Sequence, residues 1–170
     1  MTLGRSRFSL LLAPLLGLIF AIGIHGSANA ATPDTFPGAD YFVAQNYHTG
    51  LCLDAGSQDF TVSLATCDFS GDDHAQDWEL LTSGSFPAGY YELENYHTGQ
   101  CMSDQGIDDV EVIACDGNHA MLWSYTYYTG DVGNLLKDYH TGQCLGEVED
   151  SPAMQACDAT QHGQEYNFYD

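Results

Sequence analysis

Residues 46–54 read Asn-Tyr-His-Thr-Gly-Leu-Cys-Leu-Asp, and this stretch decides the fold because it returns twice further along the chain. Its second copy spans residues 95–103 and its third copy spans residues 138–146. Each copy contains Tyr-His-Thr-Gly, with a cysteine two positions after the glycine. Internal repetition at this spacing indicates an architecture of equivalent units, and it constrains the fold before any single residue does.

The repeated unit is predicted to contain four short strands. A strand-like run opens each unit, a second strand surrounds the first cysteine, a third leads into a second cysteine, and a fourth follows an aromatic residue. The closing aromatic residues are Trp78, Trp123 and Tyr166. No window after residue 30 shows a sustained helical period. Three such units predict an all-β, closed architecture in which the closing aromatics share one core.

These units resemble the repeat of the ricin B-chain type lectin domain. Cys-Leu-Asp at residues 52–54 follows a turn, a second cysteine comes about fourteen residues later, and Gln76-Asp77-Trp78 opens the last strand. The resemblance covers residues 41–170 and implies a β-trefoil, which is a six-stranded barrel capped by three hairpins with pseudo-threefold symmetry. Its three four-stranded repeats are expected at about residues 41–88, 89–131 and 132–170.

All six cysteines lie beyond residue 30. An even number of cysteines in an exported chain indicates disulfides rather than a metal or redox site, and six cysteines allow 15 pairings. The resemblance implies pairing within each repeat, namely Cys52 with Cys67, Cys101 with Cys115, and Cys144 with Cys157. Each bridge would close a loop of about fifteen residues, which stabilises a fold by on the order of 3 kcal/mol.

Residues 1–30 have the pattern of a signal peptide. Arg5 and Arg7 precede an apolar run over residues 10–24, and Ala28-Asn29-Ala30 matches the small-x-small pattern of a cleavage site. Cleavage after Ala30 is predicted, with residues 31–40 as a linker. The alternative is an uncleaved membrane anchor, for which the apolar run is short. The protein is therefore expected to be secreted and extracellular, without membrane contact once the signal is removed.

The chain is strongly acidic, with a formal net charge of −21. Removal of residues 1–30 would leave Lys137 as the only lysine or arginine against 24 acidic residues, a formal charge of −23. A field of this sign repels phosphate polymers and anionic lipid surfaces, which excludes nucleic acid and acidic membranes as partners. Neutral or cationic ligands are permitted, although the acidity can also serve solubility alone.

The resemblance also implies where each repeat would bind a sugar. In that family an aspartate two residues after the first cysteine accepts hydrogen bonds from sugar hydroxyls, and an aromatic residue two before the second cysteine stacks on the ring. Asp54 and Gln76 occupy the acid and glutamine positions of the first repeat, whereas Ser103 and Gly146 stand at the acid position of the others. The three stacking positions are not aromatic: Ala65, Ile113 and Gln155.

The first repeat is therefore the predicted carbohydrate site, with Asp54 and Gln76 as its binding residues. Both residues also have a structural interpretation, because Asp54 could cap a turn and Gln76 could hydrogen-bond within the fold. Phe60, Phe69 and Tyr47 lie near the site in sequence and could replace the missing stacking ring. Their alternative role is a loop or hairpin contact.

Histidines also follow the repeat, once in each Tyr-His-Thr-Gly turn and once two residues before each closing Gln-x-aromatic position. Repetition alone explains them, so no metal site is predicted. The chain has no Gly-x-Ser-x-Gly, His-Glu-x-x-His or phosphate-loop motif, so we expect neither an enzyme nor a cofactor.

Two hypotheses for the function follow. The first is a secreted lectin-like module, expected to be monomeric, that binds a neutral glycan or polysaccharide weakly through the first repeat. The alternative is a trefoil scaffold with degenerate sugar sites that binds or inhibits another protein through its loops. The missing stacking residues favour the alternative, whereas the retained Asp54 favours the first hypothesis.

Overall fold

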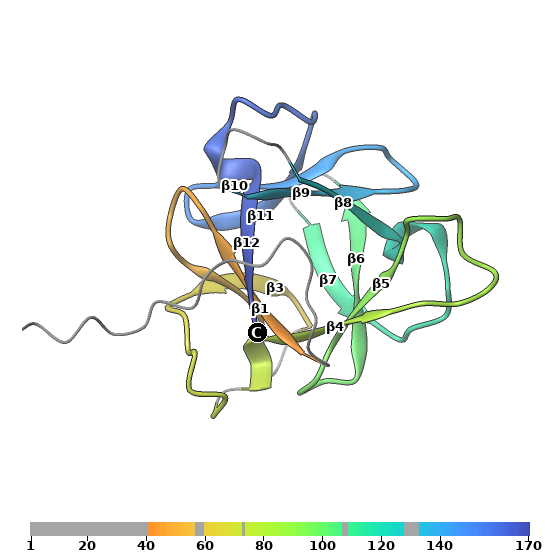
Figure 1. Ribbon diagram of the computed structural model, residues 1–170, viewed down its shortest axis with the longest axis horizontal. Helices are drawn as coiled ribbons and strands as arrows, with labels where there is room; N and C mark the ends of the chain where they lie inside the picture. The colour runs from red at the N-terminus through yellow and green to blue at the C-terminus, as the bar shows by residue number, and fades with distance from the viewer. Residues whose placement is uncertain (1–40, 57–59, 73, 107–108, 128–132) are drawn as a thin grey trace, which may run out of the picture. The chain divides into compact units, whose positions relative to one another are not determined.

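Four short strands in each of three copies of the repeat make up the computed structural model (Figure 1). The structure describes residues 41–56, 60–72, 74–106, 109–127 and 133–170. The predicted signal peptide at 1–30 and the predicted linker at 31–40 lie outside the described residues.

The three copies have the same order of elements, with a 3-10 helix directly before the last strand. Copy 1 contains β1 (Phe42–Asn46), β2 (Cys52–Ala55), β3 (Val62–Ala65), η1 (His74–Gln76) and β4 (Asp77–Leu81). Copy 2 contains β5 (Glu92–Asn95), β6 (Gln100–Gly106), β7 (Asp109–Ile113), η2 (His119–Met121) and β8 (Trp123–Tyr127). Copy 3 contains β9 (Asn134–Asp138), β10 (Cys144–Val148), β11 (Ser151–Gln155), η3 (His162–Gln164) and β12 (Glu165–Tyr169).

The first and last strands of the copies form a six-stranded antiparallel barrel. Strand β1 pairs with β4 and β12, β4 pairs with β5, and β9 pairs with β8 and β12. An isolated bridge between Tyr91 and Trp123 joins the β5 and β8 sides and completes the ring. The middle strands pair as three hairpins, β2–β3, β6–β7 and β10–β11. This barrel with three hairpins is the predicted β-trefoil.

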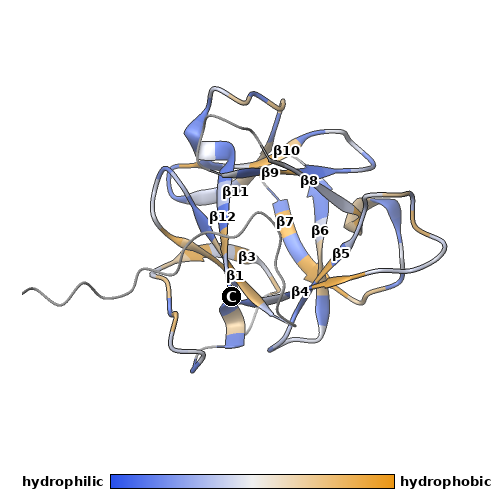
Figure 2. Ribbon diagram, in the orientation of Figure 1, coloured by the Kyte–Doolittle hydropathy of each residue, from blue (hydrophilic) through white to orange (hydrophobic). Residues whose placement is uncertain are grey.

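The closing aromatic of each copy lies in one shared core. Trp78, Trp123 and Tyr166 are fully buried, and the strands around them carry the apolar segments coloured orange in Figure 2. The indole N–H of Trp78 donates to the carbonyl of Leu53 at 3.1 Å, and that of Trp123 donates to the carbonyl of Met102 at 2.9 Å. Each buried polar group thus has a partner in the hairpin of its own copy, which fixes the hairpin over the barrel.

Tyr166 replaces tryptophan in copy 3 and keeps a similar bond. Its hydroxyl donates to the carbonyl of Gly146 at 3.4 Å, again in the hairpin of its own copy. The substitution therefore preserves the contact between barrel and hairpin although the ring is smaller.

Three disulfides join Cys52 to Cys67, Cys101 to Cys115, and Cys144 to Cys157. This is the pairing that the resemblance implies, one bridge within each copy. The first cysteine of each pair is buried in the strand that follows the turn, and the second lies just after the third strand. Each bridge therefore ties the two ends of one hairpin together.

The repeated Tyr-His-Thr-Gly forms a turn that is held by the residue before it. In copy 1 the side-chain Oδ1 of Asn46 accepts hydrogen bonds from the backbone N–H of His48 and of Thr49, both at 3.1 Å. Gly50 has a φ of +70°, a conformation that glycine adopts without steric cost. Asn95 and Asp138 stand at the same place in the other copies. The sequence pattern predicted the turn but not the role of the residue before it.

Each turn also contacts the 3-10 helix of the preceding copy, and we call these contacts the seams. At the 1/2 seam the side chain of Asn95 donates to the carbonyl of Ala75 at 2.8 Å. At the 3/1 seam Asn46 donates to the carbonyl of Gly163 at 2.9 Å. At the 2/3 seam the backbone N–H of Tyr139 donates to the carbonyl of Leu122 at 2.8 Å. The seams therefore connect copies that the disulfides leave separate.

Candidate functional site

Asp54 in copy 1 presents a carboxylate at the surface of the hairpin. It lies in β2, opposite Ser63 of β3, and is partly exposed. Its Oδ2 accepts a hydrogen bond from Nε2 of Gln76 at 3.2 Å. Its other oxygen, Oδ1, accepts no hydrogen bond from the described part of the chain. One oxygen is thus held in place while the other remains available to a ligand.

Gln76 has a different position, because its side chain lies inside the fold. It is 1% exposed, and its Nε2 also donates to the carbonyl of Thr66 at 3.0 Å. Its Oε1 accepts the backbone N–H of Asp68 at 2.8 Å. Both ends of the amide are therefore used to connect η1 with the end of the hairpin. This matches the structural interpretation of Gln76 and makes it the residue that orients Asp54.

No aromatic ring occupies the stacking position of copy 1, which is the partly exposed Ala65. The nearby aromatics have contacts elsewhere. The carbonyl of Phe60 accepts the backbone N–H of Val112 in copy 2 at 2.7 Å, which places Phe60 between two hairpins. The ring of Phe69 contacts that of Tyr169, with centroids 5.2 Å apart. Both phenylalanines are nevertheless exposed, so the apolar surface near this site is carried by loops.

Copy 2 presents no carboxylate at the equivalent place. Ser103, at the acid position, is fully buried, and the neighbouring Asp104 is buried as well. The carboxylate of Asp104 accepts the backbone N–H of Gly106 at 2.8 Å and the hydroxyl of Thr141 at 2.9 Å. Met121 replaces the glutamine and is also buried. The polar groups that a sugar would need are therefore absent or already paired in this copy.

In copy 3 the side chain of Gln155 occupies the space beside Gly146, where the family has its aspartate. A Cβ atom at Gly146 would lie 2.8 Å from Nε2 of Gln155 and 3.1 Å from Cγ of Gln164. An aspartate cannot occupy this position unless Gln155 moves. Gln155 is in turn held by a bond from its Nε2 to the carbonyl of Glu147 at 3.1 Å. Copy 3 thus lacks the family arrangement although it keeps the glutamine.

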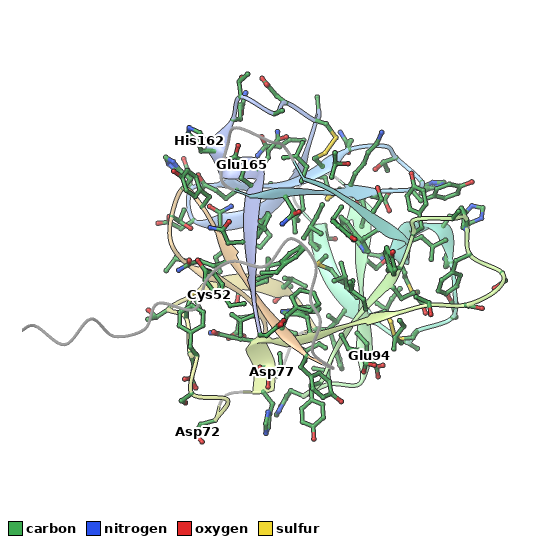
Figure 3. The ribbon with its side chains drawn as sticks, in the orientation of Figure 1. Cys52, Asp72, Asp77, Glu94, His162 and Glu165 are labelled. Carbon is green, nitrogen blue, oxygen red and sulfur yellow. A yellow bond between two sulfur atoms is a disulfide. The ribbon has the colours of Figure 1, made fainter. Side chains whose placement is uncertain are left out.

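A pocket of about 350 Å³ lies at the 3/1 seam. The turn of copy 1 meets η3 there, and Figure 3 shows His162 and Glu165 on the copy 3 side. The carboxylate of Glu147 lies 3.7 Å from Nε2 of His48, and Nδ1 of His162 lies 2.9 Å from the carboxylate of Glu165. The lining residues are polar apart from one glycine: His48, Glu147, Gln155, Gln161, His162 and Gly163.

This pocket was not predicted from the sequence. The available signal was Glu147, an acid one place after the position where the family has its aspartate. The contribution of His48 could not be predicted, because it comes from the turn of copy 1, about a hundred residues earlier in the chain.

The six histidines of the described residues lie in the three turns and at the start of the three 3-10 helices. His74, His119 and His162 each contact the tyrosine of the next turn, with ring centroids 4.7, 5.0 and 5.1 Å from Tyr96, Tyr139 and Tyr47. Within the described residues no group of three or more histidine, cysteine or acidic side chains could hold a metal ion. In the same part of the chain, no helix has the length and apolarity that crossing a membrane requires.

Solved structures share this fold at low sequence identity. The designed threefold-symmetric protein ThreeFoil has a TM-score of 0.63 and 20% identity, over 78% of this chain and 99% of its own. SeviL bound to asialo-GM1 saccharide has a TM-score of 0.62 and 16% identity, over 76% of this chain and 96% of its own. The Polyporus squamosus lectin bound to a human-type influenza-binding epitope has a TM-score of 0.63 and 16% identity, over 79% of this chain and 50% of its own.

At these identities the likeness shows the fold alone. No curated protein matches this chain significantly in sequence. The model of the ricin-type beta-trefoil lectin domain, however, matches residues 40–166, a span that includes the three cysteine pairs and the closing aromatic of every copy. The chain therefore belongs to the ricin-type beta-trefoil lectin domain family.

Proposed function

We propose that this protein is a secreted carbohydrate-binding module that binds a neutral glycan weakly through copy 1. The single observation that carries this proposal is the carboxylate of Asp54, which is partly exposed, is oriented by Gln76 and has no partner for Oδ1 among the described residues. The family supports a glycan as the ligand. SeviL and the Polyporus squamosus lectin, which share the fold, are each bound to an oligosaccharide.

In this proposal the chain consists of a cleaved signal peptide at 1–30, a linker at 31–40 and a monomeric trefoil at 41–170. Sugar hydroxyls donate hydrogen bonds to Oδ1 of Asp54, and Gln76 prevents the carboxylate from turning away. Without a stacking ring at Ala65, binding is expected near the millimolar range, or about 4 kcal/mol. The proposed role is binding without catalysis, in which the retained polar groups recognise sugar hydroxyls.

The test compares two variants that remove the same charge from copy 1. Asp54→Asn is expected to weaken glycan binding strongly, because an amide has one accepting oxygen in place of two and a neutral oxygen accepts a hydroxyl hydrogen bond more weakly than a carboxylate. Asp72→Asn is the control, since this carboxylate is exposed and outside the site (Figure 3). Binding is measured on a glycan array and then by titration with the best sugar. Equal binding by Asp54→Asn and the unmodified protein would refute the site.

A second candidate function is protein binding through the loops, and one observation favours it. Phe60 and Phe69 lie in loops of copy 1 and, at 54% and 56%, are the most exposed large apolar side chains of the described residues. A glycan array without hits, together with a protein captured from the extracellular fluid and lost on Phe60→Ser, would support this function. Capture that persists in Phe60→Ser and Phe69→Ser would exclude these loops.

A further inference from the structure

The pocket at the 3/1 seam differs from the family site because copy 3 has two glycines at critical positions. Gly146 stands at the acid position, which allows Gln155 to cover it. Gly163 stands where copy 1 has Ala75, and a Cβ there would lie 3.4 Å from Cγ and Oε1 of Glu147. These are ordinary contact distances, and they place the Glu147 side chain directly against η3. The acid of this pocket is thus displaced by one residue, toward the turn of copy 1.

Glu147 is a nearly buried acid, and no lysine or arginine of the described residues forms an ion pair with it. Its side chain is 13% exposed, and its Oε2 accepts the backbone N–H of Asp150 at 3.2 Å. The nearest basic group is the largely exposed imidazole of His48, 3.7 Å away. Lys137 is the only lysine or arginine after residue 7. It lies in β9, where its Cε would be 3.7 Å from a Cβ atom added to Gly142. A cation in the pocket would therefore meet a carboxylate whose ion-pair partner among the described residues is an exposed histidine.

The rest of the lining suits a polyhydroxylated ligand. The Gln155 amide donates to the carbonyl of Glu147 and accepts from Gln164 at 3.4 Å, and the Gln161 amide donates to Asp158 at 3.4 Å. Each amide keeps a second N–H hydrogen and a lone pair on its oxygen for a ligand in the pocket. The pocket volume of about 350 Å³ is at the lower end of the range for small-ligand sites, which is about 300–1,000 Å³. The tyrosine ring of Tyr47, packed against His162, adds an aromatic surface next to the pocket. The long-range field of so acidic a chain also attracts cations.

We propose that the seam pocket binds an amino sugar, whose ammonium group pairs with Glu147 and whose hydroxyls contact Gln155 and Gln161. This proposal rests on the proposed function in that the ligand is a sugar, but it uses different residues from Asp54. The ligand class is a hexosamine with a free amine, and its N-acetylated form is discriminated against because the acetamide carries no charge.

The test uses the disulfide-bonded protein and the disaccharide of glucosamine, with the fully N-acetylated disaccharide as the comparison ligand. The free-amine disaccharide is expected to bind about tenfold more tightly, because a charge-assisted hydrogen bond replaces a neutral one. Glu147→Gln is expected to remove this advantage. Glu149→Gln is the matched control, because it removes the same charge from an exposed position on the same hairpin. This variant should keep the tighter binding of the free-amine disaccharide. Calorimetric titration measures each affinity.

Two outcomes would overturn the proposal. Equal loss in Glu147→Gln and Glu149→Gln would show attraction by the overall charge without a site, and equal affinity for the two disaccharides would remove the role of the amine. A measurement on the unmodified protein avoids any dependence on folding of the variants. The NMR signals of the His48 and His162 rings should shift on titration with the glucosamine disaccharide, whereas those of His97 and His140 should not. Unchanged His48 and His162 signals would exclude the pocket.

The two proposed sites fail independently. Asp54→Asn should leave amino-sugar binding unchanged, because Asp54 lies in the hairpin of copy 1 and lines no part of the seam pocket. Neutral-glycan binding that survives Glu147→Gln while the amine preference disappears would support both sites. Amino-sugar binding that is lost in Asp54→Asn but retained in Glu147→Gln would overturn the assignment to the seam.

Discussion

The 1/2 and 2/3 seams have the same turn geometry but differ in one buried group. At the 1/2 seam Asn95 accepts the backbone N–H of Thr98 at 3.1 Å and donates through Nδ2 to the carbonyls of Ala75 and Asp77 at 2.8 and 3.2 Å. At the 2/3 seam the same place is taken by Asp138, which is fully buried. An amide can both accept and donate, whereas an ionised carboxylate can only accept.

The consequence appears at the second oxygen of Asp138. Its Oδ2 accepts the backbone N–H and the hydroxyl of Thr141 at 2.6 and 2.9 Å, but Oδ1 is buried without a hydrogen-bond partner in the described part of the chain. Burial raises the pKa of Asp138 above its ordinary value of 3.8, the bonds from Thr141 oppose this, and the nearby Asp104 raises it further. The acid at this place is therefore expected to make the 2/3 seam more sensitive to pH than the 1/2 seam.

The largest effect is expected when the acid is moved to the other seam. Asn95→Asp would place a carboxylate against the carbonyls of Ala75 and Asp77, which now accept from its amide. We expect the free energy of unfolding to fall by about 3 kcal/mol at neutral pH, because two bonds are lost and a charge is buried. Urea unfolding followed by tryptophan fluorescence measures this. Asn95→Asp with unchanged stability would mean that the seam tolerates a carboxylate.

The reverse change at Asp138 should stabilise the protein. Asp138→Asn removes a buried charge beside Asp104 and restores the amide that Asn95 uses as a donor at the 1/2 seam, so we expect a gain of about 2 kcal/mol at pH 7. A raised pKa in the folded state means that the contribution of Asp138 to stability is fully present at low pH. It is lost as the pH rises through that pKa.

The stability difference between Asp138→Asn and the unmodified protein should therefore be small below about pH 4 and grow above it. Urea unfolding at a series of pH values checks the sign. A difference that is constant with pH would show that Asp138 does not titrate differently in the folded and unfolded states.

Removing the threonine hydroxyl of the turn should destabilise the protein more at the 2/3 seam than at the 1/2 seam, by less than the two changes above. The hydroxyl of Thr141 lies 2.9 Å from carboxylate oxygens of both Asp138 and Asp104, whereas that of Thr98 lies 3.3 Å from the neutral Asn95. Because bonds to charged groups are stronger, Thr141→Val should cost about 1.5 kcal/mol and Thr98→Val about half of that. Thermal unfolding of both variants at pH 7 gives the comparison, and a greater loss in Thr98→Val would contradict it.

The smallest expected difference between the two seams concerns the aromatic contacts, which both of them have. Tyr96 contacts His74 and Tyr41 at centroid distances of 4.7 and 4.6 Å. Tyr139 contacts His119 and Tyr90 at 5.0 and 4.8 Å. Tyr96→Ala and Tyr139→Ala should therefore each cost about 1 kcal/mol, and the two values should agree. Chemical denaturation measures both, and unequal losses would show that the seams also differ at the surface.

Much of the fold followed from the repetition, because equivalent segments must occupy equivalent places in a closed architecture. The closing aromatics predicted the core, and Trp78 and Trp123 indeed donate to equivalent carbonyls in the hairpins. The site was harder to predict. Asp54 was located by its distance from Cys52, but the sequence could not show that Gln76 is committed to the fold at both ends of its amide. That depends on where the end of the hairpin meets η1.

The sequence by itself determined the three equivalent units, their cysteine pairs and their shared core, since these follow from local patterns that repeat in each copy. Only the tertiary structure decided what the seams contain. His48 meets Glu147 there, and Asp138 meets Asp104, although each pair is far apart along the chain. The physical reason is that hydrogen bonding, burial and charge depend on which groups share a volume, and the closed barrel joins the first copy to the last.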